Sequence, residues 1–277
     1  MEQSGTELSR PGSGRRIRDV RLEQAERVDW SVAAGESWSS ARELWRHLRT
    51  HTNLIAATEL LDWLEFLPPR ASVLDLGCGS GWLAAKLSRI GEVERVVAWD
   101  SSWRLLCEVL PAMVAEVGGE PGKIEPVCGN FTPLLLDDDS IDLVVMSSAF
   151  HHAPEPEALL ADLRRVLSRS GAVVLLNETP WPPLGLLGFS LRLMLVHLWN
   201  LAGLPQRRWA GELGDDHVLY DPSLGDRAYS ARAWRALARR GGFALQMRDT
   251  GMFSYPADWR RPGRFEPKLT HLVLSPR

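Results

Sequence analysis

A glycine-rich turn that directly follows an apolar run constrains the fold of this chain more than any other feature. The run Ser72–Leu76 leads into residues 77–81, with the sequence GCGSG, and the next stretch, Trp82–Arg89, has a helical composition. Glycine has no Cβ and tolerates positive φ, so the backbone of such a turn can approach a ligand closely. The free amides at the start of the helix would face the same ligand. The sequence therefore predicts a strand, loop and helix unit that holds a small molecule.

A second apolar run ends in an acidic residue and narrows the class of ligand. Val96–Trp99 is followed by Asp100, and an acidic side chain at the tip of a neighbouring parallel strand is where a ribose diol is held. The turn lacks the third glycine of dinucleotide enzymes, because Trp82 stands in its place. Asp75, near the end of the first strand, would repel a pyrophosphate and suits an ammonium partner. We expect a nucleoside-containing cofactor, and the spacing disfavours a nicotinamide oxidoreductase.

Several segments, in order along the chain, resemble those of one enzyme family. Val73–Gly81 resembles the first motif of class I S-adenosylmethionine (SAM)-dependent methyltransferases, and Cys128–Phe131, Ser147–His152 and Arg164–Gly171 resemble later elements of the small-molecule type. The resemblance implies an α/β fold with a seven-stranded, mostly parallel, Rossmann-like sheet that includes an antiparallel final strand. It also implies that the cofactor is SAM and the product S-adenosylhomocysteine.

Apolar runs alternate with amphipathic stretches from Ser72 onward, which indicates a parallel α/β sheet. The expected strands are Ser72–Leu76, Val96–Asp100, Ile124–Cys128, Ile141–Met146, Gly171–Asn177, Phe243–Asp249 and Leu269–Ser275. The expected helices are Ser39–Thr50, Asn53–Phe66, Trp82–Arg89, Trp103–Val117, Glu157–Leu167 and Ala231–Arg240. Pro111 should kink or split the helix in which it lies.

The domain organisation follows from composition along the chain. Residues 1–27 have little apolar periodicity and are expected to be a disordered tail, and residues 28–68 an N-terminal helical lid. Residues 69–277 are expected to form the SAM-binding domain, with a cap inserted at about 181–228, after the fifth strand. Within it, Leu184–Leu204 is apolar but interrupted by Arg192, His197 and Asn200. We favour an amphipathic cap and keep association with a membrane surface as the alternative.

The overall composition is that of an ordinary globular protein and argues against several other classes. The net charge of −3 shows no overall excess of positive charge that would attract nucleic acid, so we expect no nucleic-acid partner. The cysteines Cys78, Cys107 and Cys128 lack the spacing of a zinc site or a disulfide framework, and no signal peptide is visible, so we expect a cytoplasmic location and no metal. The acidic run Asp137–Asp139 precedes a strand and is expected to be a solvated turn.

The resemblance assigns roles around the cofactor. The glycine turn would pass the methionyl end, Asp75 would pair with its ammonium group or cap its own turn, and Asp100 would accept from the ribose hydroxyls or cap the next helix. Asn130 stands where the family usually carries Asp, and its amide oxygen can still accept from the adenine amino group. The expected cofactor-binding residues are Asp75, Gly77, Cys78, Gly79, Asp100, Ser101, Asn130, Phe131 and Ser147.

Methyl transfer to a hydroxyl oxygen requires a base, and histidine is suited to that task near neutral pH. His151 and His152 follow the fourth strand, at the edge where open α/β sheets bind ligands. We expect His152 to be the base, with His151 and His217 as alternatives and Glu178 as a further polar candidate. His217 follows an acidic pair that could orient its ring.

The leading hypothesis is a SAM-dependent O-methyltransferase acting on a small organic acceptor, a natural product or sugar-containing metabolite of secondary metabolism. The segment after the fourth strand is not the Asn-Pro-Pro-Tyr sequence of amino-directed methyltransferases, which disfavours a nitrogen acceptor in a nucleobase or glutamine. Two alternatives remain open. One is a methyltransferase-fold protein that binds SAM in a binding or regulatory role, and the other is a protein or nucleic-acid methyltransferase. The sequence leaves the oligomeric state open.

Overall fold

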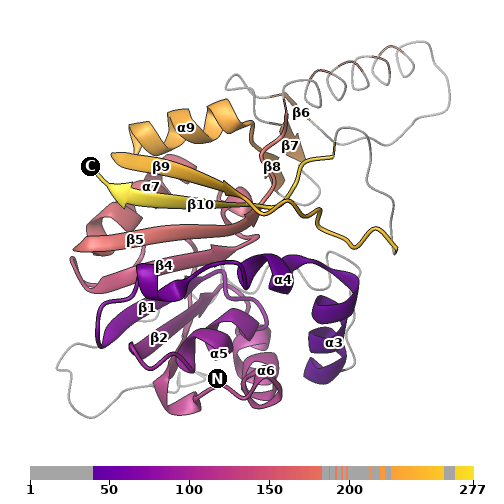
Figure 1. Ribbon diagram of the computed structural model, residues 1–277. Helices are drawn as coiled ribbons and strands as arrows, with labels where there is room; N and C mark the ends of the chain where they lie inside the picture. The colour runs from indigo at the N-terminus through magenta and orange to yellow at the C-terminus, as the bar shows by residue number, and fades with distance from the viewer. Residues whose placement is uncertain are drawn as a thin grey trace, which may run out of the picture.

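A seven-stranded sheet forms the centre of the molecule in the computed structural model (Figure 1). The structure describes residues 40–182, 226–258 and 266–277, together with residues 187, 191, 195, 198, 212–213 and 219–221. The strand order is β3-β2-β1-β4-β5-β10-β9. The strands are β1 (Ala71–Leu76), β2 (Val93–Asp100), β3 (Ile124–Cys128), β4 (Ile141–Ser147), β5 (Leu167–Glu178), β9 (Phe243–Asp249) and β10 (Thr270–Pro276).

The direction of the strands confirms the predicted α/β fold. β3, β2, β1, β4 and β5 pair in parallel, whereas β10 runs antiparallel to both β5 and β9. In a parallel sheet the carboxyl ends of successive strands meet at one edge, and the order changes direction between β1 and β4. The loops after β1, β2, β3 and β4 therefore open at the same edge of the sheet. A separate three-stranded sheet contains β6 (Glu212–Leu213), β7 (Leu219–Asp221) and β8 (Asp226–Ala228).

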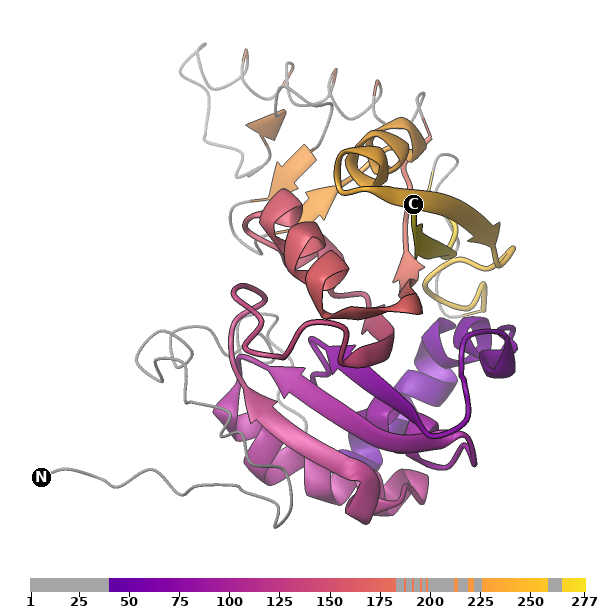
Figure 2. The ribbon, with the colours of Figure 1, turned by 90° about the vertical axis from the view of Figure 1, so that its left-hand side faces the viewer.

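Alternate side chains of the central strands pack into two apolar cores, one on each face of the sheet. In β1, Leu74 and Leu76 pack with the helices on one side, whereas Val73 packs with those on the other, as expected from the two-residue period of a strand. The first face is covered by α7 (Pro156–Val166) and α9 (Ala231–Arg240), and the second by α5 (Trp82–Ser88) and α6 (Leu110–Val117). Figure 2 shows helices on both sides of the sheet. The layers are those of a doubly wound domain.

The distortion expected at Pro111 is confirmed. The helix that begins at Trp103 is π-helical over Leu105–Val109 and continues as α6. Proline has no amide hydrogen to donate to the preceding turn, so the helix widens locally before it resumes. This widened turn faces the cavity described below.

One predicted helix is wrong in its extent. The expected helix Asn53–Phe66 ends early: α4 covers only Leu54–Thr58, and a separate 3-10 turn covers Trp63–Glu65. The physical reason is that the Ala57 carbonyl, which would continue the helix, lies 2.8 Å from the imidazole Nε2 of His271 and accepts the Leu60 amide in a tighter turn. Tertiary contact thus stops the helix where the sequence pattern alone would continue it.

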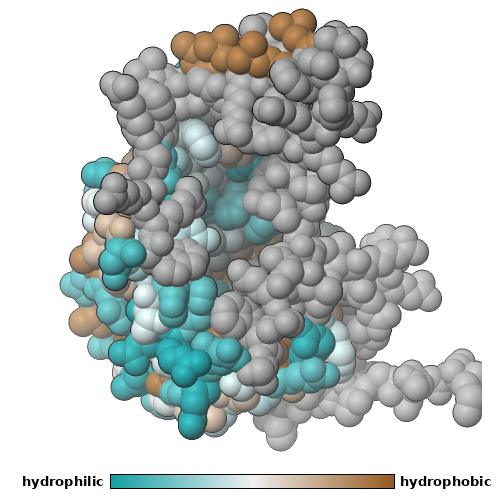
Figure 3. Space-filling view, turned by 90° about the vertical axis from the view of Figure 1, so that its right-hand side faces the viewer, coloured by the Kyte–Doolittle hydropathy of each residue, from teal (hydrophilic) through white to brown (hydrophobic). Residues whose placement is uncertain are grey.

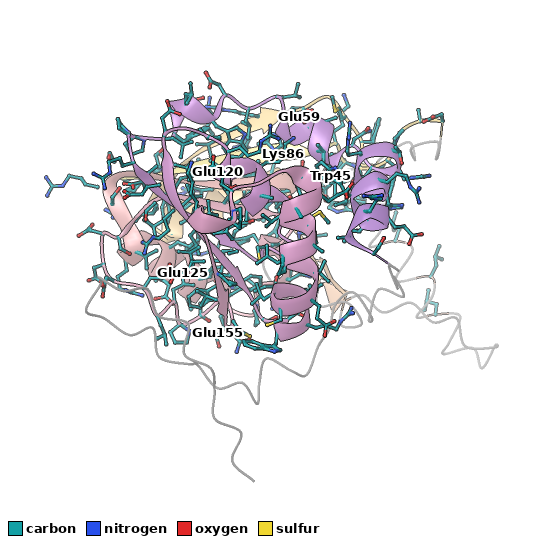
Figure 4. The ribbon with its side chains drawn as sticks, turned by 90° about the horizontal axis from the view of Figure 1, so that it is seen from below. Trp45, Glu59, Lys86, Glu120, Glu125 and Glu155 are labelled. Carbon is teal, nitrogen blue, oxygen red and sulfur yellow. The ribbon has the colours of Figure 1, made fainter. Side chains whose placement is uncertain are left out.

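The preceding helix, α3 (Ala41–His51), begins two residues after the predicted start at Ser39. Ser40 caps it by accepting from the Glu43 amide, as the sequence signal for a helix start requires. Behind α4, Glu59 forms an ion pair with Lys86 of α5, and Figure 4 shows the two side chains side by side. The predicted tail 1–27, the first part of the lid and most of the cap lie outside the described residues. Within the described part of the chain, no helix is both long and apolar enough to cross a bilayer.

We predict that His271 makes stability depend on pH. Its ring is 1% exposed, the Asn177 amide donates to Nδ1 at 3.3 Å, and Nε2 lies at donor distance from Ala57, so the neutral ring fits. Burial lowers the pKa of His271, and the charge of Arg248 lowers it further against the opposing effect of the Ala57 carbonyl. The unfolded chain therefore takes up more protons as pH falls below about 6.5, and stability is lost down to the native pKa.

The measurement is chemical unfolding of the wild type and His271→Gln between pH 5 and pH 8. We expect the variant to lose about 1–3 kcal/mol at pH 8 because a buried hydrogen bond is broken. It should also lose part of the decline in stability toward low pH. His51→Gln, on the half-exposed end of α3, is the matched control and should match the wild type. A pH profile of His271→Gln identical to that of the wild type would contradict this account.

Candidate functional site

The loops at the carboxyl edge of the parallel strands enclose one cavity of about 1520 Å³. Figure 3 looks onto this edge of the molecule, where the surface is hollowed. Each loop contributes from a different strand end: the glycine turn from β1, Asp100 from β2, Asn130 from β3 and Ser147 from β4. All nine residues expected to bind the cofactor line it, namely Asp75, Gly77, Cys78, Gly79, Asp100, Ser101, Asn130, Phe131 and Ser147. The structure thus brings together residues up to 72 positions apart in sequence.

The glycine turn, residues 77–81, is fixed by hydrogen bonds and packs closely against neighbouring residues. The backbone amides of Gly77 and Cys78 both donate to the Trp99 carbonyl, at 2.7 and 3.0 Å, which fixes the turn against the end of β2. Gly77 has φ +73°, and a Cβ there would come within 2.8 Å of Ala149. Gly79 has φ +52° but faces open space. A side chain would therefore strain the backbone at both positions, and at Gly77 it would also meet Ala149 in close contact.

Asp100 joins the ends of the first two strands. One carboxylate oxygen accepts from the Gly79 amide at 2.8 Å, and the other accepts from the Ser102 amide at 2.8 Å. The second contact is the helix-capping role that the sequence left open. The carboxylate also lines the cavity, so capping and ligand binding are compatible on geometry. Ser102 in turn caps the next turn by accepting from Leu105.

Asp75 is a buried carboxyl at the floor of the cavity. It is 1% exposed, the Ala84 amide in the first turn of α5 donates to it, and its Oδ2 has no hydrogen-bond partner among the described residues. Burial raises the pKa of Asp75 to about 7, and the nearby negative charge of Asp100 also raises it, whereas the Ala84 hydrogen bond opposes the shift. An unsatisfied buried oxygen that faces a cavity favours a cationic or hydrogen-bond-donating ligand.

The loop after β3 forms another wall. The Trp99 indole donates to the Asn130 carbonyl at 3.0 Å, so the main chain of Asn130 is fixed while its side chain remains a wall of the cavity. The Phe131 ring would lie 3.1 Å from a Cβ at Gly77, which means that it packs against the glycine turn. Phe131 is partly exposed and so keeps a face toward the cavity.

The two adjacent histidines occupy different environments. They belong to a short 3-10 helix, Phe150–His152, directly after β4. His152 lines the cavity, whereas His151 is not among its walls. The His151 Nδ1 instead lies 3.0 Å from Oε2 of Glu178, whose side chain is 3% exposed. The two imidazole rings are 4.3 Å apart. His217 lies outside the described residues.

Two residues that the sequence analysis missed support this histidine turn. Asn177 donates to Ser147 at 3.2 Å and to Thr58 of α4 at 3.1 Å, and its own φ is +59°. Arg227 of β8 donates to the carbonyls of Ala153 and Pro154, just after the histidines. Asparagine tolerates a left-handed backbone, which is a weak sequence signal. Arg227 offers no such signal, because it is distant from the histidine turn in sequence and only the tertiary structure brings the two together.

The acidic run Asp137–Asp139 lies at the opposite edge, before β4. Arg165 binds Asp138 there at 2.8 Å, which fits a solvated turn. Within the described residues no group of three or more histidine, cysteine or acidic side chains could hold a metal ion.

The residues of the cavity fit a SAM-type cofactor on structural grounds. Asp75 offers a buried, unsatisfied oxygen for an ammonium group, the glycine turn leaves the main chain accessible, and Asp100 presents a carboxylate at the end of β2. The cavity lies at the point where the strand order changes direction, which is where open α/β sheets bind nucleotides.

Comparisons with known proteins agree with this geometry. Residues 74–175 match a family model described as a methyltransferase domain. The chain is 34% identical over 129 residues to a demethylmenaquinone methyltransferase of Clavibacter sepedonicus, a match that covers 45% of this chain and 48% of that protein. The first curated relatives are covered over only 34–48% of their lengths.

Solved structures share the fold at low sequence identity. A SAM-dependent methyltransferase from Aquifex aeolicus matches with a TM-score of 0.52 at 17% identity, over 90% of this chain and 98% of that one. The 1,6-didemethyltoxoflavin-N1-methyltransferase of Burkholderia thailandensis, solved with S-adenosylhomocysteine, matches with a TM-score of 0.55 at 15% identity, over 94% and 93%. Residues 74–175 therefore match a methyltransferase domain, and the chain as a whole shares the Rossmann-like fold of these SAM-dependent methyltransferases.

Proposed function

We propose that this protein transfers a methyl group from SAM to a hydroxyl oxygen of a small organic acceptor. The observation that carries the proposal is the placement of His152 in the same cavity as Asp75, Asp100 and the glycine turn. A base and the cofactor-binding residues then line one cavity. The family match supports methyl transfer, and the choice of oxygen as the acceptor atom is our inference.

Each expected cofactor-binding residue is assigned to the part of SAM that its chemistry suits. We propose that Asp75 pairs with the α-ammonium group, that the amides and carbonyls of Gly77, Cys78 and Gly79 follow the methionyl chain, and that Asp100 accepts from the ribose hydroxyls. The adenine would lie near Ser101, Asn130 and Phe131, with Ser147 beside the reacting end. Bound SAM supplies an already activated methyl group, so the protein has to provide alignment and a place for the acceptor proton.

We propose that His152 accepts the proton of the acceptor hydroxyl as its oxygen attacks. His151 lies behind it and binds the buried Glu178 carboxylate, which fixes the orientation of the His151 ring and offsets a positive charge that develops on the pair. His151 and Glu178 are therefore positioning residues here. His217 remains the alternative base.

The acceptor is proposed to be apolar over much of its surface. One wall of the cavity comes from α3 and the widened turn before α6, with the side chains of Leu44, Leu48, Leu105 and Val109. We propose that residues 28–68 act as a lid and residues 181–228 as a cap over the acceptor. A demethylmenaquinone methyltransferase among the relatives fits an apolar acceptor, and the toxoflavin enzyme shows that this fold also serves a nitrogen acceptor.

We predict that Asp100→Ala weakens binding of S-adenosylhomocysteine by roughly 2–3 kcal/mol, because hydrogen bonds to a charged acceptor are lost. Isothermal titration calorimetry measures the affinity. Asp100→Asn keeps the size and one acceptor oxygen, so its loss should be intermediate. Asp137→Ala, an exposed acid at the opposite edge, is the control and should bind as the wild type does. Wild-type affinity of a folded Asp100→Ala protein would show that the ribose lies elsewhere.

We predict that His152→Ala lowers methyl transfer by about 10²–10⁴-fold, the range of general base catalysis, while the affinity for S-adenosylhomocysteine stays unchanged. The assay follows the mass gain of one methyl group on a panel of phenols and hydroquinones incubated with SAM. His47→Ala, on α3, controls for the loss of a histidine away from the strand ends. Full activity of His152→Ala would exclude it as the base.

The same assay separates the alternative functions. Tight binding of S-adenosylhomocysteine without turnover on any acceptor class would favour a binding or regulatory role. Methylation of protein or nucleic acid, with none of the small molecules modified, would replace the small-molecule proposal.

A further inference from the structure

Four exposed leucines lie in the part of the chain between β5 and β6. Leu187, Leu191, Leu195 and Leu198 are each helical and are exposed by 56%, 48%, 63% and 53%. Residues spaced by four, four and three positions share one face of an α-helix. The four leucines account for the brown patch at the top of Figure 3. We call these four residues the leucine stripe.

The sequence around the leucine stripe is positively charged. Between Leu184 and Ala210 there are three arginines, Arg192, Arg207 and Arg208, and no acidic residue, although the whole chain has a net charge of −3. The stretch also contains Phe189 and Trp199. Apolar residues combined with arginines and aromatic residues are the composition of segments that lie in a membrane interface. Acidic phospholipids complement the positive charge of this stretch.

We propose that the leucine stripe docks the protein on the surface of an anionic phospholipid bilayer. A second copy of the chain is a poorer partner, because a stable protein interface uses roughly 20–30 residues on each side and the stripe has four. The excess of arginine would also repel the same segment of a second copy. The sequence alone favoured an amphipathic cap and kept association with a membrane surface as the alternative, and the exposure of all four leucines supports a cap segment that also docks on a bilayer.

The experiment is co-sedimentation of the full chain with vesicles of phosphatidylcholine and phosphatidylglycerol, compared with pure phosphatidylcholine. We expect the wild type to bind the anionic vesicles at least tenfold more tightly, and high salt to weaken that binding. The double variant Leu191→Glu/Leu195→Glu should lose at least tenfold in affinity. Leu60→Glu/Leu64→Glu is the matched control, since these leucines are equally exposed, at 59% and 57%, but lie outside the stripe. The control should bind vesicles as the wild type does.

Three outcomes would overturn the proposal. They are absence of vesicle binding by the wild type, equal loss of binding in the stripe variant and the control, and a change of the stripe variant from dimer to monomer in light scattering without vesicle binding. Affinity for S-adenosylhomocysteine, measured on the same samples, verifies that each variant is folded at the cofactor cavity. Because vesicle binding needs neither cofactor nor acceptor, its failure would leave the proposed methyl transfer untouched.

Discussion

The two hydrogen bonds that the Asp100 carboxylate accepts from Gly79 and Ser102 hold the ends of β1 and β2 in one geometry. The rest of the site is arranged around this connection. The bond from Gly79 fixes the glycine turn at that residue, and the amides of Gly77 and Cys78 fix it further by donating to the Trp99 carbonyl. Because these hydrogen bonds fix the turn, its main chain stays accessible to a ligand at the wall of the cavity. Asp75, buried beneath it, then supplies an oxygen that no described residue satisfies.

A second set of contacts links the histidine turn to distant parts of the fold. Glu178 at the end of β5 binds His151, Asn177 beside it joins Ser147 to α4, and Arg227 holds the turn from β8. Phe150 in the same turn packs on Trp234 of α9, with ring centroids 5.2 Å apart. Contacts from the sheet, from α4 and from β8 therefore surround the turn that carries the proposed base. A change in any of these elements can reach the acceptor side of the cavity.

Much of this arrangement was predictable because it depends on local pattern. The alternation of apolar residues in β1 and the glycines after it predict both the strand and the turn, and the edge rule for parallel sheets predicts that Asp100, Asn130 and His152 converge. What could not be predicted depends on contacts between distant segments. The early end of α4 depends on His271, and the support of the histidine turn depends on Arg227. The sequence gives no sign that His151 binds Glu178, and only the fold turns His151 toward that carboxylate and leaves His152 at the cavity.

The central claim is that the cavity at the strand ends is built for an adenosyl amino acid. The most direct measurement is calorimetric titration of the purified chain with S-adenosylhomocysteine and, separately, with NADH. We predict saturable binding of one S-adenosylhomocysteine per chain and no binding of NADH. Binding of NADH with none of S-adenosylhomocysteine would contradict the assignment of Asp75, Asp100 and the glycine turn.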